Sequence, residues 1–197
     1  MHTSKGRSGS TVAGDYFRDL YRRTDDPWHF STSPYERAKY RATLDALPRA
    51  RYRSALELAC SIGVFTAQLA QRAGAVLGVD VSPDALASAR RRCASLPNVR
   101  FAPCDLAAEF PPGSYDLVTF CEAGFYFGPR DLARIRDGIA NALEPGGDLV
   151  LVHWTPLVEG HAQTADDVHE AFLADARFAH RAGSRAETYR LDVCSRW

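Results

Sequence analysis

The residues of this chain best placed to do chemistry lie where one apolar run ends in small side chains and the next ends in a carboxylate. The first run covers residues 55–60 and leads into a helical pattern, and the second ends at Asp80. Small residues occupy the turn after the first run, at Ala59, Ser61 and Gly63. Such a turn lets a ligand approach the backbone, and an acid at the next strand tip can accept hydrogen bonds from ribose hydroxyls. The order of these parts predicts a nucleoside site.

The spacing of the small residues distinguishes between nucleoside cofactors. A dinucleotide fingerprint, G-x-G-x-x-G, would fall on Ala59, Ser61 and Val64, and branched Val64 fits poorly where a helix must pack closely on a strand. Spaced as small-x-small-x-Gly, the turn is Ala59, Ser61 and Gly63, which suits a ribose with an amino-acid tail and needs no pyrophosphate cradle. The turn therefore disfavours a dinucleotide, and an NAD-dependent dehydrogenase stays an alternative.

Two groups at predicted strand ends could manage a proton. Glu122 follows the apolar run 116–121, and His153 ends the run 147–153. The ordinary pKa of histidine makes His153 the better base, and Glu122 could orient the reacting group. His153 could instead be structural and tie down a loop. We predict no metal, because His161, His169 and His180 lack metal-ligand spacing.

Alternating apolar runs and helical patterns must position these groups. Strands are predicted at 55–60, 75–80, 99–104, 116–121 and 147–153, and helices at 64–73, 83–95 and 130–144. This alternation implies an α/β fold with right-handed crossovers and a parallel sheet covered by helices on both faces. After a helix near 164–176, segments 177–181 and 187–196 predict a hairpin around residues 182–185, with one antiparallel strand at the sheet edge.

Two helical patterns at 13–22 and 34–47 precede this core and are rich in aromatic residues: Tyr16, Tyr21, Trp28, Tyr35 and Tyr40. Ligands of open α/β sheets bind at the carboxyl ends of the strands, so we expect residues 13–48 to form a helical lid over that edge. Residues 49–197 would form the core domain. Arg37 or Lys39 could then meet a carboxylate of the cofactor. The alternative is that the aromatic side chains only pack the helices down.

The composition of the chain limits its number of domains, its partners and its compartment. The chain has 197 residues, enough for one domain with its own core, and its 24 basic residues balance 24 acidic ones. We therefore expect no nucleic-acid or membrane partner and a monomer or homodimer. Residues 1–12 are polar and predict a disordered leader, not a signal peptide. The 5 cysteines have no C-x-x-C spacing, which indicates reduced thiols in a cytoplasmic protein.

The segment Glu57–Gly63 resembles the first motif of class I S-adenosylmethionine-dependent methyltransferases, E-x-G-x-G-x-G, with Ala59 and Ser61 in place of two glycines. Further motifs of that family follow in register at Asp80, Asp105, 115–118 and 143–150. The resemblance implies a Rossmann-like methyltransferase fold and S-adenosyl-L-methionine as cofactor. Asp80 would bind the ribose and Asp105 the adenine amino group, although singly the first could cap a helix and the second could be a loop acid.

With the lid, the resemblance implies a cofactor-binding set: Glu57, Ala59, Cys60, Ser61, Gly63, Phe65, Asp80, Val81, Asp105, Leu106, Cys121, Tyr35 and Arg37. The lead-in over residues 15–40 is similar to that of the nodulation S type, whose members methylate the amine of a glucosamine unit. This implies N-methylation of a small-molecule amine, with His153 or Glu122 managing the proton. Expected substrate contacts are Tyr16, Trp28, Tyr126, Phe127 and Trp154. Alternatives are O-methylation of a small molecule and a non-catalytic cofactor-binding scaffold.

Overall fold

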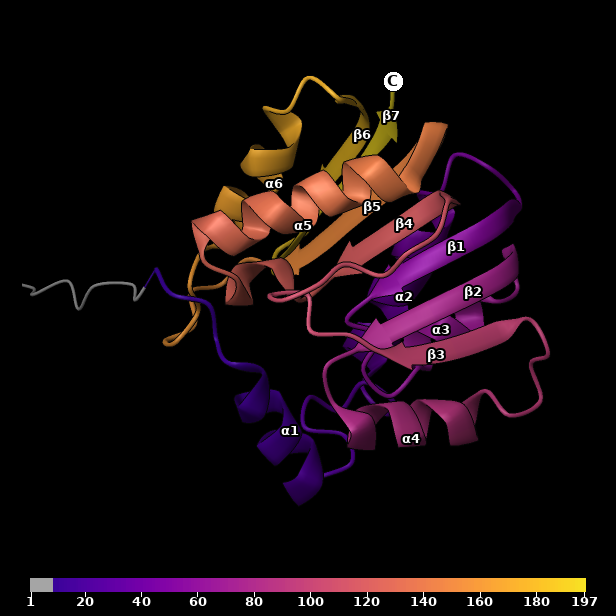
Figure 1. Ribbon diagram of the computed structural model, residues 1–197, viewed down its shortest axis with the longest axis vertical. Coiled ribbons are helices and arrows are strands. Elements are labelled where there is room, and N and C mark those ends of the chain that lie inside the picture. Colours follow the sequence, from indigo (N-terminus) through magenta and orange to yellow (C-terminus); the bar gives the residue numbers. More distant parts are fainter. Residues whose placement is uncertain (1–8) are drawn as a thin grey trace, which may run out of the picture.

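A single seven-stranded sheet organises the chain in the computed structural model, which describes residues 9–197 (Figure 1). The strand order is β3-β2-β1-β4-β5-β7-β6, and all pairings among β1 to β5 are parallel. The strands are β1 (Tyr52–Leu58), β2 (Ala73–Asp80), β3 (Val99–Pro103), β4 (Tyr115–Cys121), β5 (Leu143–Trp154), β6 (Phe178–Arg185) and β7 (Tyr189–Arg196). The predicted α/β class with a mostly parallel sheet and a carboxyl-terminal hairpin is confirmed.

The hairpin differs from the prediction in two respects. The antiparallel strand β7 does not lie at the edge, because it pairs with β5 on one side and with β6 on the other. Residues 182–185 belong to strand β6, and the turn follows them. The burial of the two strands explains the order: β7 is buried at residues 191–195, whereas β6 is exposed from residue 181 onward. The more polar strand therefore takes the edge, where one side is open to water.

Helices cover both faces of the sheet, and Figure 1 shows α5 and α6 on one face with α2 and α3 behind the other. The helices are α1 (Gly14–Arg23), α2 (Pro34–Asp45), α3 (Val64–Leu69), α4 (Pro83–Arg92), α5 (Pro129–Ala142) and α6 (Ala165–Leu173), with a 3-10 turn η1 (Gly124–Tyr126). Two of the predicted helices begin with a serine cap. Ser33 and Ser82 cap α2 and α4 by accepting backbone hydrogen bonds, and each is followed by proline.

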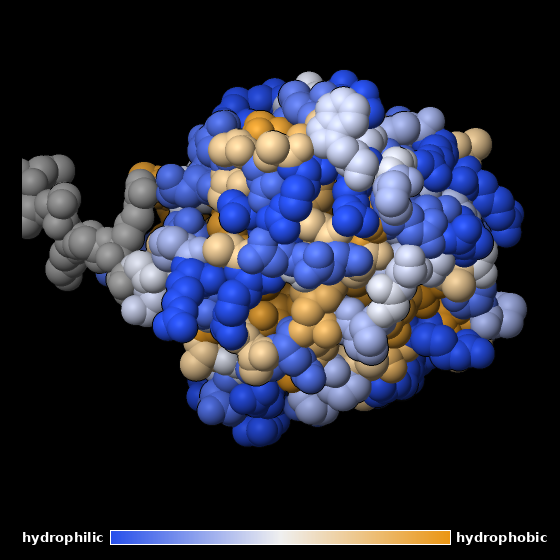
Figure 2. Space-filling model, turned by 45° about the horizontal axis from the view of Figure 1, so that its top comes forward, coloured by the Kyte–Doolittle hydropathy of each residue, from blue (hydrophilic) through white to orange (hydrophobic). Residues whose placement is uncertain are grey.

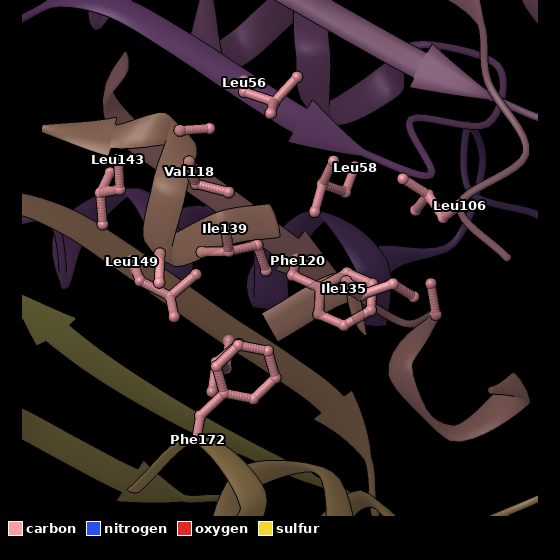
Figure 3. Packing of buried hydrophobic residues seen from close by; sticks show 14 of the residues in the cluster. Leu56, Leu58, Leu106, Val118, Phe120, Ile135, Ile139, Leu143, Leu149 and Phe172 are labelled. Carbon is pink, nitrogen blue, oxygen red and sulfur yellow. The ribbon is translucent and has the colours of Figure 1, made fainter. Parts of the chain in front are cut away.

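Side chains alternate along the strands and fill a core on each face. On the face of α5 and α6, Phe120 packs with Ile135 and Phe172, and Leu56 and Leu58 join them (Figure 3). On the other face a second cluster packs α3 against the sheet through Phe65 and Leu69. Because β1 contributes to both clusters, it is buried on both sides and holds the turn that follows it in a fixed position.

The start of the described chain is tied to the carboxyl edge of the sheet. The Val12 N–H donates to the Tyr126 carbonyl at 2.8 Å, and the Gly128 N–H donates to Thr11 Oγ at 2.9 Å. Most of the predicted leader, residues 1–8, lies outside the described residues. The face in Figure 2 is largely hydrophilic, with apolar side chains visible between polar ones. Within residues 9–197, no helix is long and apolar enough to cross a membrane.

Candidate active site

A cavity of about 830 Å³ lies at the carboxyl ends of β1, β2 and β4, beneath α1 and α2. It is in the size range of small-ligand and cofactor sites. The structure brings most of the predicted site residues to its lining: Tyr16, Trp28, Tyr35, Glu57, Ala59, Cys60, Ser61, Phe65, Asp80, Val81, Asp105, Leu106, Cys121, Glu122, Tyr126, Phe127 and Trp154. Residues of the first two helices therefore lie over the strand ends, in the place where a lid was predicted.

The turn after β1 keeps the left-handed backbone of a glycine-rich loop although it contains two other residue types. The φ angles are 55° at Ala59, 52° at Ser61 and 73° at Gly63. These are the three glycine positions of the motif that the sequence resembles. A non-glycine residue in this region costs about 1 kcal/mol or more. The chain thus keeps a turn whose backbone a ligand can approach closely, and it does so at the expense of strain at Ala59 and Ser61.

Gly63 is a sequence-predicted contact that the structure does not place in the lining. It caps the start of α3, and a Cβ there would lie 2.9 Å from Ala89 Cβ on α4. Its positive φ and this close approach both require glycine. Gly63 thus shapes the turn and lets α3 pack against α4, and it does not line the cavity.

Asp80 connects the two turns that flank the cavity. Its Oδ2 accepts from the Ser61 N–H and its Oδ1 from the Ser82 N–H, both at 2.9 Å. Helix α4 is capped by Ser82, whose Oγ accepts from the Ala85 N–H, so Asp80 is not its cap. A carboxylate has lone pairs beyond these two bonds, and Asp80 lines the cavity. It can therefore accept further hydrogen bonds from a ligand.

Glu57 is a buried carboxylate at the end of β1 that also lines the cavity. It is 5% exposed, and its Oε2 has no hydrogen-bond partner among the described residues. Burial raises the pKa of Glu57 to about 8. A positively charged ligand group beside this carboxylate would supply the missing partner and favour its ionised form. The amino group of an amino-acid tail has that charge.

Lys39 is held between two carboxylates in the lining of the cavity. Its Nζ donates to Glu36 Oε1 at 2.9 Å and to Glu122 Oε1 at 2.5 Å, and the lysine side chain is 3% exposed. Glu122 Oε2 in turn accepts from the Trp154 N–H at 2.8 Å. Burial alone would lower the pKa of Lys39, but the two carboxylates raise it. The lysine is therefore a neutralised part of the wall and offers no free charge to a ligand carboxylate.

Aromatic rings form the remainder of the wall and come from distant parts of the chain. Tyr35 of α2 meets Trp154 of β5 edge to face, with ring centroids 5.7 Å apart. Phe17 of α1 meets Tyr126 in the same manner at 4.9 Å. Tyr16 is 53% exposed although it lines the cavity, so it lies at the mouth. This wall presents ring faces and edges suited to a flat or sugar-like ligand.

Besides Gly63, two further predicted residues lie outside the lining. Arg37 donates to the Thr32 carbonyl at 2.8 Å and does not line the cavity, because helical spacing turns Glu36 and Lys39 inward and Arg37 outward. His153 is fully buried beneath the wall, with hydrogen bonds at both ring nitrogens. The geometry contradicts its predicted role as a base and agrees with the structural alternative.

The sequence reasoning missed Glu36, although its spacing from Lys39 contained the signal. Residues three apart on a helix share one face, and both residues belong to a segment expected to cover the site. Their joint partner Glu122 is distant in sequence, so only the fold could reveal the cluster. Among residues 9–197, no group of three His, Cys, Asp or Glu side chains is arranged to hold a metal ion.

Comparison with known proteins agrees with this geometry. Residues 55–147 match the model of a methyltransferase domain. A protein from Pseudomonas syringae whose solved structure is assigned as a methyltransferase is 35% identical, with a TM-score of 0.73; the match covers 82% of this chain and 99% of that one. Nodulation protein S of Rhizobium tropici is 32% identical over 130 residues, which are 64% of this chain and 54% of that protein.

A further solved structure, the N-methyltransferase NodS of Bradyrhizobium japonicum WM9 in complex with S-adenosyl-L-homocysteine, has a TM-score of 0.81 at 23% identity. It covers 91% of this chain and 97% of the other, and at this identity it supports the fold alone. The chain spans about half the length of the curated relatives that it matches, as the 54% coverage of the first shows.

A mostly parallel sheet with a carboxyl-terminal hairpin, and a cavity between a left-handed turn and an acidic strand tip, define the class I methyltransferase architecture. The chain belongs to the class I S-adenosylmethionine-dependent methyltransferases, and its sequence is similar to nodulation protein S. This confirms the predicted family and its cofactor. The cavity fits that cofactor on its own chemistry. Glu57 Oε2, which has no hydrogen-bond partner among residues 9–197, matches an ammonium group, and the lining acids Asp80 and Asp105 match a nucleoside.

Proposed function

We propose that this protein transfers the methyl group of S-adenosylmethionine to an amine of a small molecule, with an amino sugar as the first candidate. The observation that carries the proposal is the charge of the cavity. Six acidic side chains line it: Glu36, Glu57, Asp80, Asp105, Glu122 and Glu159. Lys39 is the one lysine or arginine among the described lining residues, and it is paired with two of those acids. Even with Glu57 largely protonated at pH 7, the other acids outnumber the one lysine, so the lining attracts a cationic amine and repels carboxylate acceptors.

The cofactor would be held on the side of the turn after β1. We assign Asp80 to the ribose hydroxyls and Asp105 to the adenine amino group, with Leu106 packing beside the ring. Glu57 would pair with the amino group of the methionine tail, and the strained turn at Ala59 and Ser61 would bring its backbone close to that tail. When bound, S-adenosylmethionine supplies a methyl group on a sulfonium, which is already activated for transfer.

The acceptor would be held between the aromatic wall and the acidic cluster. Trp154 and Tyr126 offer surfaces on which a sugar ring can stack. Both carboxylate oxygens of Glu122 are already hydrogen-bonded, so we assign this residue to orientation of the acceptor. Alignment of the two reactants supplies much of the acceleration in a transfer of this kind.

The proton of the amine needs an acceptor, because a protonated amine has no lone pair with which to attack. We assign this role to Glu36. It lines the cavity, its Oε2 has no hydrogen-bond partner among residues 9–197, and burial raises its pKa. A carboxylate with an unused oxygen and a raised pKa suits the uptake of a proton. With His153 withdrawn from the cavity, Glu36 replaces it in the proposed mechanism.

The proposal is tested by cofactor binding and by a product screen. Calorimetry should detect binding of S-adenosylhomocysteine and none of NAD. Incubation with cofactor labelled in the methyl group should then label amines in a panel of glucosamine oligomers, other amino sugars, phenols and carboxylic acids. Label in phenols alone would indicate O-methylation, and cofactor binding with no labelled product across the panel would favour a non-catalytic scaffold.

A further inference from the structure

Three buried polar side chains lie behind the cavity wall in a single hydrogen-bonded row. His153 of β5 and His169 of α6 are 0% exposed, and Asp192 of β7 is 3% exposed. His153 Nδ1 is 3.0 Å from His169 Nε2, and His169 Nδ1 is 2.7 Å from Asp192 Oδ2. At the other end, the Gly124 N–H donates to His153 Nε2 at 3.0 Å. We call Asp192, His169 and His153 the buried relay. None of its members lines the cavity.

The amide at one end fixes every proton in the relay. Because the Gly124 N–H can only donate, His153 Nε2 must carry a lone pair and its proton must be on Nδ1. That proton is then donated to His169 Nε2, and the His169 proton lies on Nδ1 and is donated to Asp192. Both rings are thus neutral and each has one defined tautomer. Protonation of His153 would place a second donor against the Gly124 N–H and break the row.

The relay ends at the segment that forms the acceptor side of the cavity. Gly124 begins the turn η1, in which Phe125 and Tyr126 line the cavity. The Phe125 carbonyl accepts from the Ala162 N–H at 2.9 Å, so the lining loop at 158–161 is also attached to this turn. A Cβ at Gly124 would lie 2.5 Å from Val168 Cγ1 and 2.8 Å from His153 Nε2, so glycine allows this close approach.

The second connection runs along the chain from His153 itself. The next residue, Trp154, lines the cavity, and its backbone N–H donates to Glu122 Oε2. His153 is therefore hydrogen-bonded to the turn η1 through Gly124, and it is covalently joined to the lining residue Trp154. An apolar side chain at position 153 would fill the space but would leave the buried Gly124 N–H without a partner. A satisfied polar network fixes one arrangement of such groups more strictly than apolar contact does.

We propose that the buried relay positions the side of the cavity that holds the methyl acceptor, formed by Phe125, Tyr126 and Trp154. His153, His169 and Asp192 would then determine how efficiently the acceptor is methylated without contacting it. The inference rests on the proposed methyl transfer. Charged and titratable groups that face the relay from neighbouring elements are Lys39 near His153, Asp166 and Arg190 near His169, and Arg190 and His180 at Asp192. Burial lowers the pKa of both relay histidines, which keeps the rings neutral.

The first test needs no substrate. Nitrogen-15 spectra of the histidine rings in the intact chain should show both relay residues as neutral Nδ1–H tautomers at pH 7. Replacement of His153 by leucine should shift the amide signals of residues 124–127, whereas His153→Gln can still accept from the Gly124 N–H and should shift them less. An Nε2–H tautomer at His153, or unshifted amides in a folded His153→Leu variant, would overturn the proposal. A failure of the transfer activity leaves this result standing.

The second test uses catalysis with a glucosamine tetramer as acceptor. His153→Leu should lower kcat/KM for the acceptor by about a hundredfold, as expected for a misplaced reactant, with an unchanged Kd for S-adenosylhomocysteine. His153→Gln should recover part of that loss. The control is His180→Gln, because His180 also contacts Asp192 at 2.8 Å but lies outside the relay. Equal losses in cofactor and acceptor binding, or an equal effect of the control, would show a merely structural role and refute the proposal.

Discussion

The hydroxyl of Tyr21 on α1 is hydrogen-bonded to the hydroxyl of Ser61 in the turn that follows β1. Ser61 stands at a glycine position of the motif and has a φ of 52°, and Tyr21 is 5% exposed and in ring contact with Trp28. A glycine at position 61 would relax the backbone but could not make this bond. The serine thus attaches helix α1 to the turn beneath it.

This relationship predicts a measurable coupling between the two positions. Tyr21→Phe should lower the free energy of unfolding by about 1 kcal/mol through loss of the hydrogen bond. Ser61→Gly alone should change it little, because relief of strain offsets the lost bond, whereas in the Tyr21→Phe protein it should stabilise by about 1 kcal/mol. The measurement is a double-mutant cycle by urea denaturation.

Ala59→Gly is the matched control for that cycle, because Ala59 has a φ of 55° and a side chain that cannot hydrogen-bond. It should stabilise the chain by about 1 kcal/mol whether or not Tyr21 is replaced. Both glycine variants should keep their affinity for S-adenosylhomocysteine. If the effects of Ser61→Gly and Tyr21→Phe simply add, the two residues are not coupled and the attachment is unimportant.

Glu57 should make cofactor binding dependent on proton release. Burial raises the pKa of Glu57 to about 8, so most of the population is protonated at pH 7, and an ammonium group placed beside it should drive the proton off. Calorimetry of S-adenosylhomocysteine binding in buffers of different ionisation enthalpy should detect that release. Glu57→Gln should abolish it and weaken binding. Proton release that persists in Glu57→Gln would assign it to another group.

Glu36 should affect catalysis more than binding. Glu36→Gln removes the proposed proton acceptor, and loss of general-base assistance should reduce kcat by about 10²-fold or more at pH 7. The affinity for S-adenosylhomocysteine should not change. Glu159→Gln is the control, since Glu159 also lines the cavity but is more exposed and belongs to a different loop. Comparable rates for the two variants would remove Glu36 from the mechanism.

The relay histidines should make stability decrease in acid. Their pKa values are lowered by burial below the ordinary value near 6.5, so the unfolded chain binds more protons than the native one below that pH. Their contribution is complete above about pH 6.5 and is lost as the pH falls, by up to about 1.4 kcal/mol per pH unit for each group.

The corresponding measurement compares chemical denaturation of the parent and of His153→Leu between pH 7.5 and 5. The difference in slope isolates His153, because the carboxylates with raised pKa values, such as Glu57, occur in both proteins and contribute with the opposite sign. The parent should lose more stability toward pH 5 than the variant does. Parallel curves would mean that His153 is not held neutral.

Local sequence signals predicted the parts of the fold and site that local rules govern. The helices predicted at 34–47 and 83–95 are α2 and α4, and the spacing of Ala59, Ser61 and Gly63 predicted a turn of small residues between a strand and a helix. Strand order at the hairpin was missed, because it depends on which strand has the more buried sequence, a property of the assembled sheet.

The difference between local signals and contacts made only in the assembled fold also explains which site residues were predicted wrongly. His153 was predicted as a base from its position at a strand end, but the direction of its side chain follows from β5 alternation, which buries it under the wall. Its partners His169 and Asp192 come from later elements and could not be paired with it from sequence. Glu36 was overlooked for a related reason, since its role depends on Lys39 meeting Glu122 across the fold.

The most direct test of the central claim is the site of methylation on a matched pair of acceptors. The protein should be incubated with methyl-labelled S-adenosylmethionine and either a glucosamine tetramer or its fully N-acetylated counterpart, and the products mapped by mass spectrometry. The acidic cavity predicts label on nitrogen of the first compound and none on the second. Label on oxygen in both, or efficient labelling of a carboxylic acid instead, would contradict the assignment of this enzyme to amines.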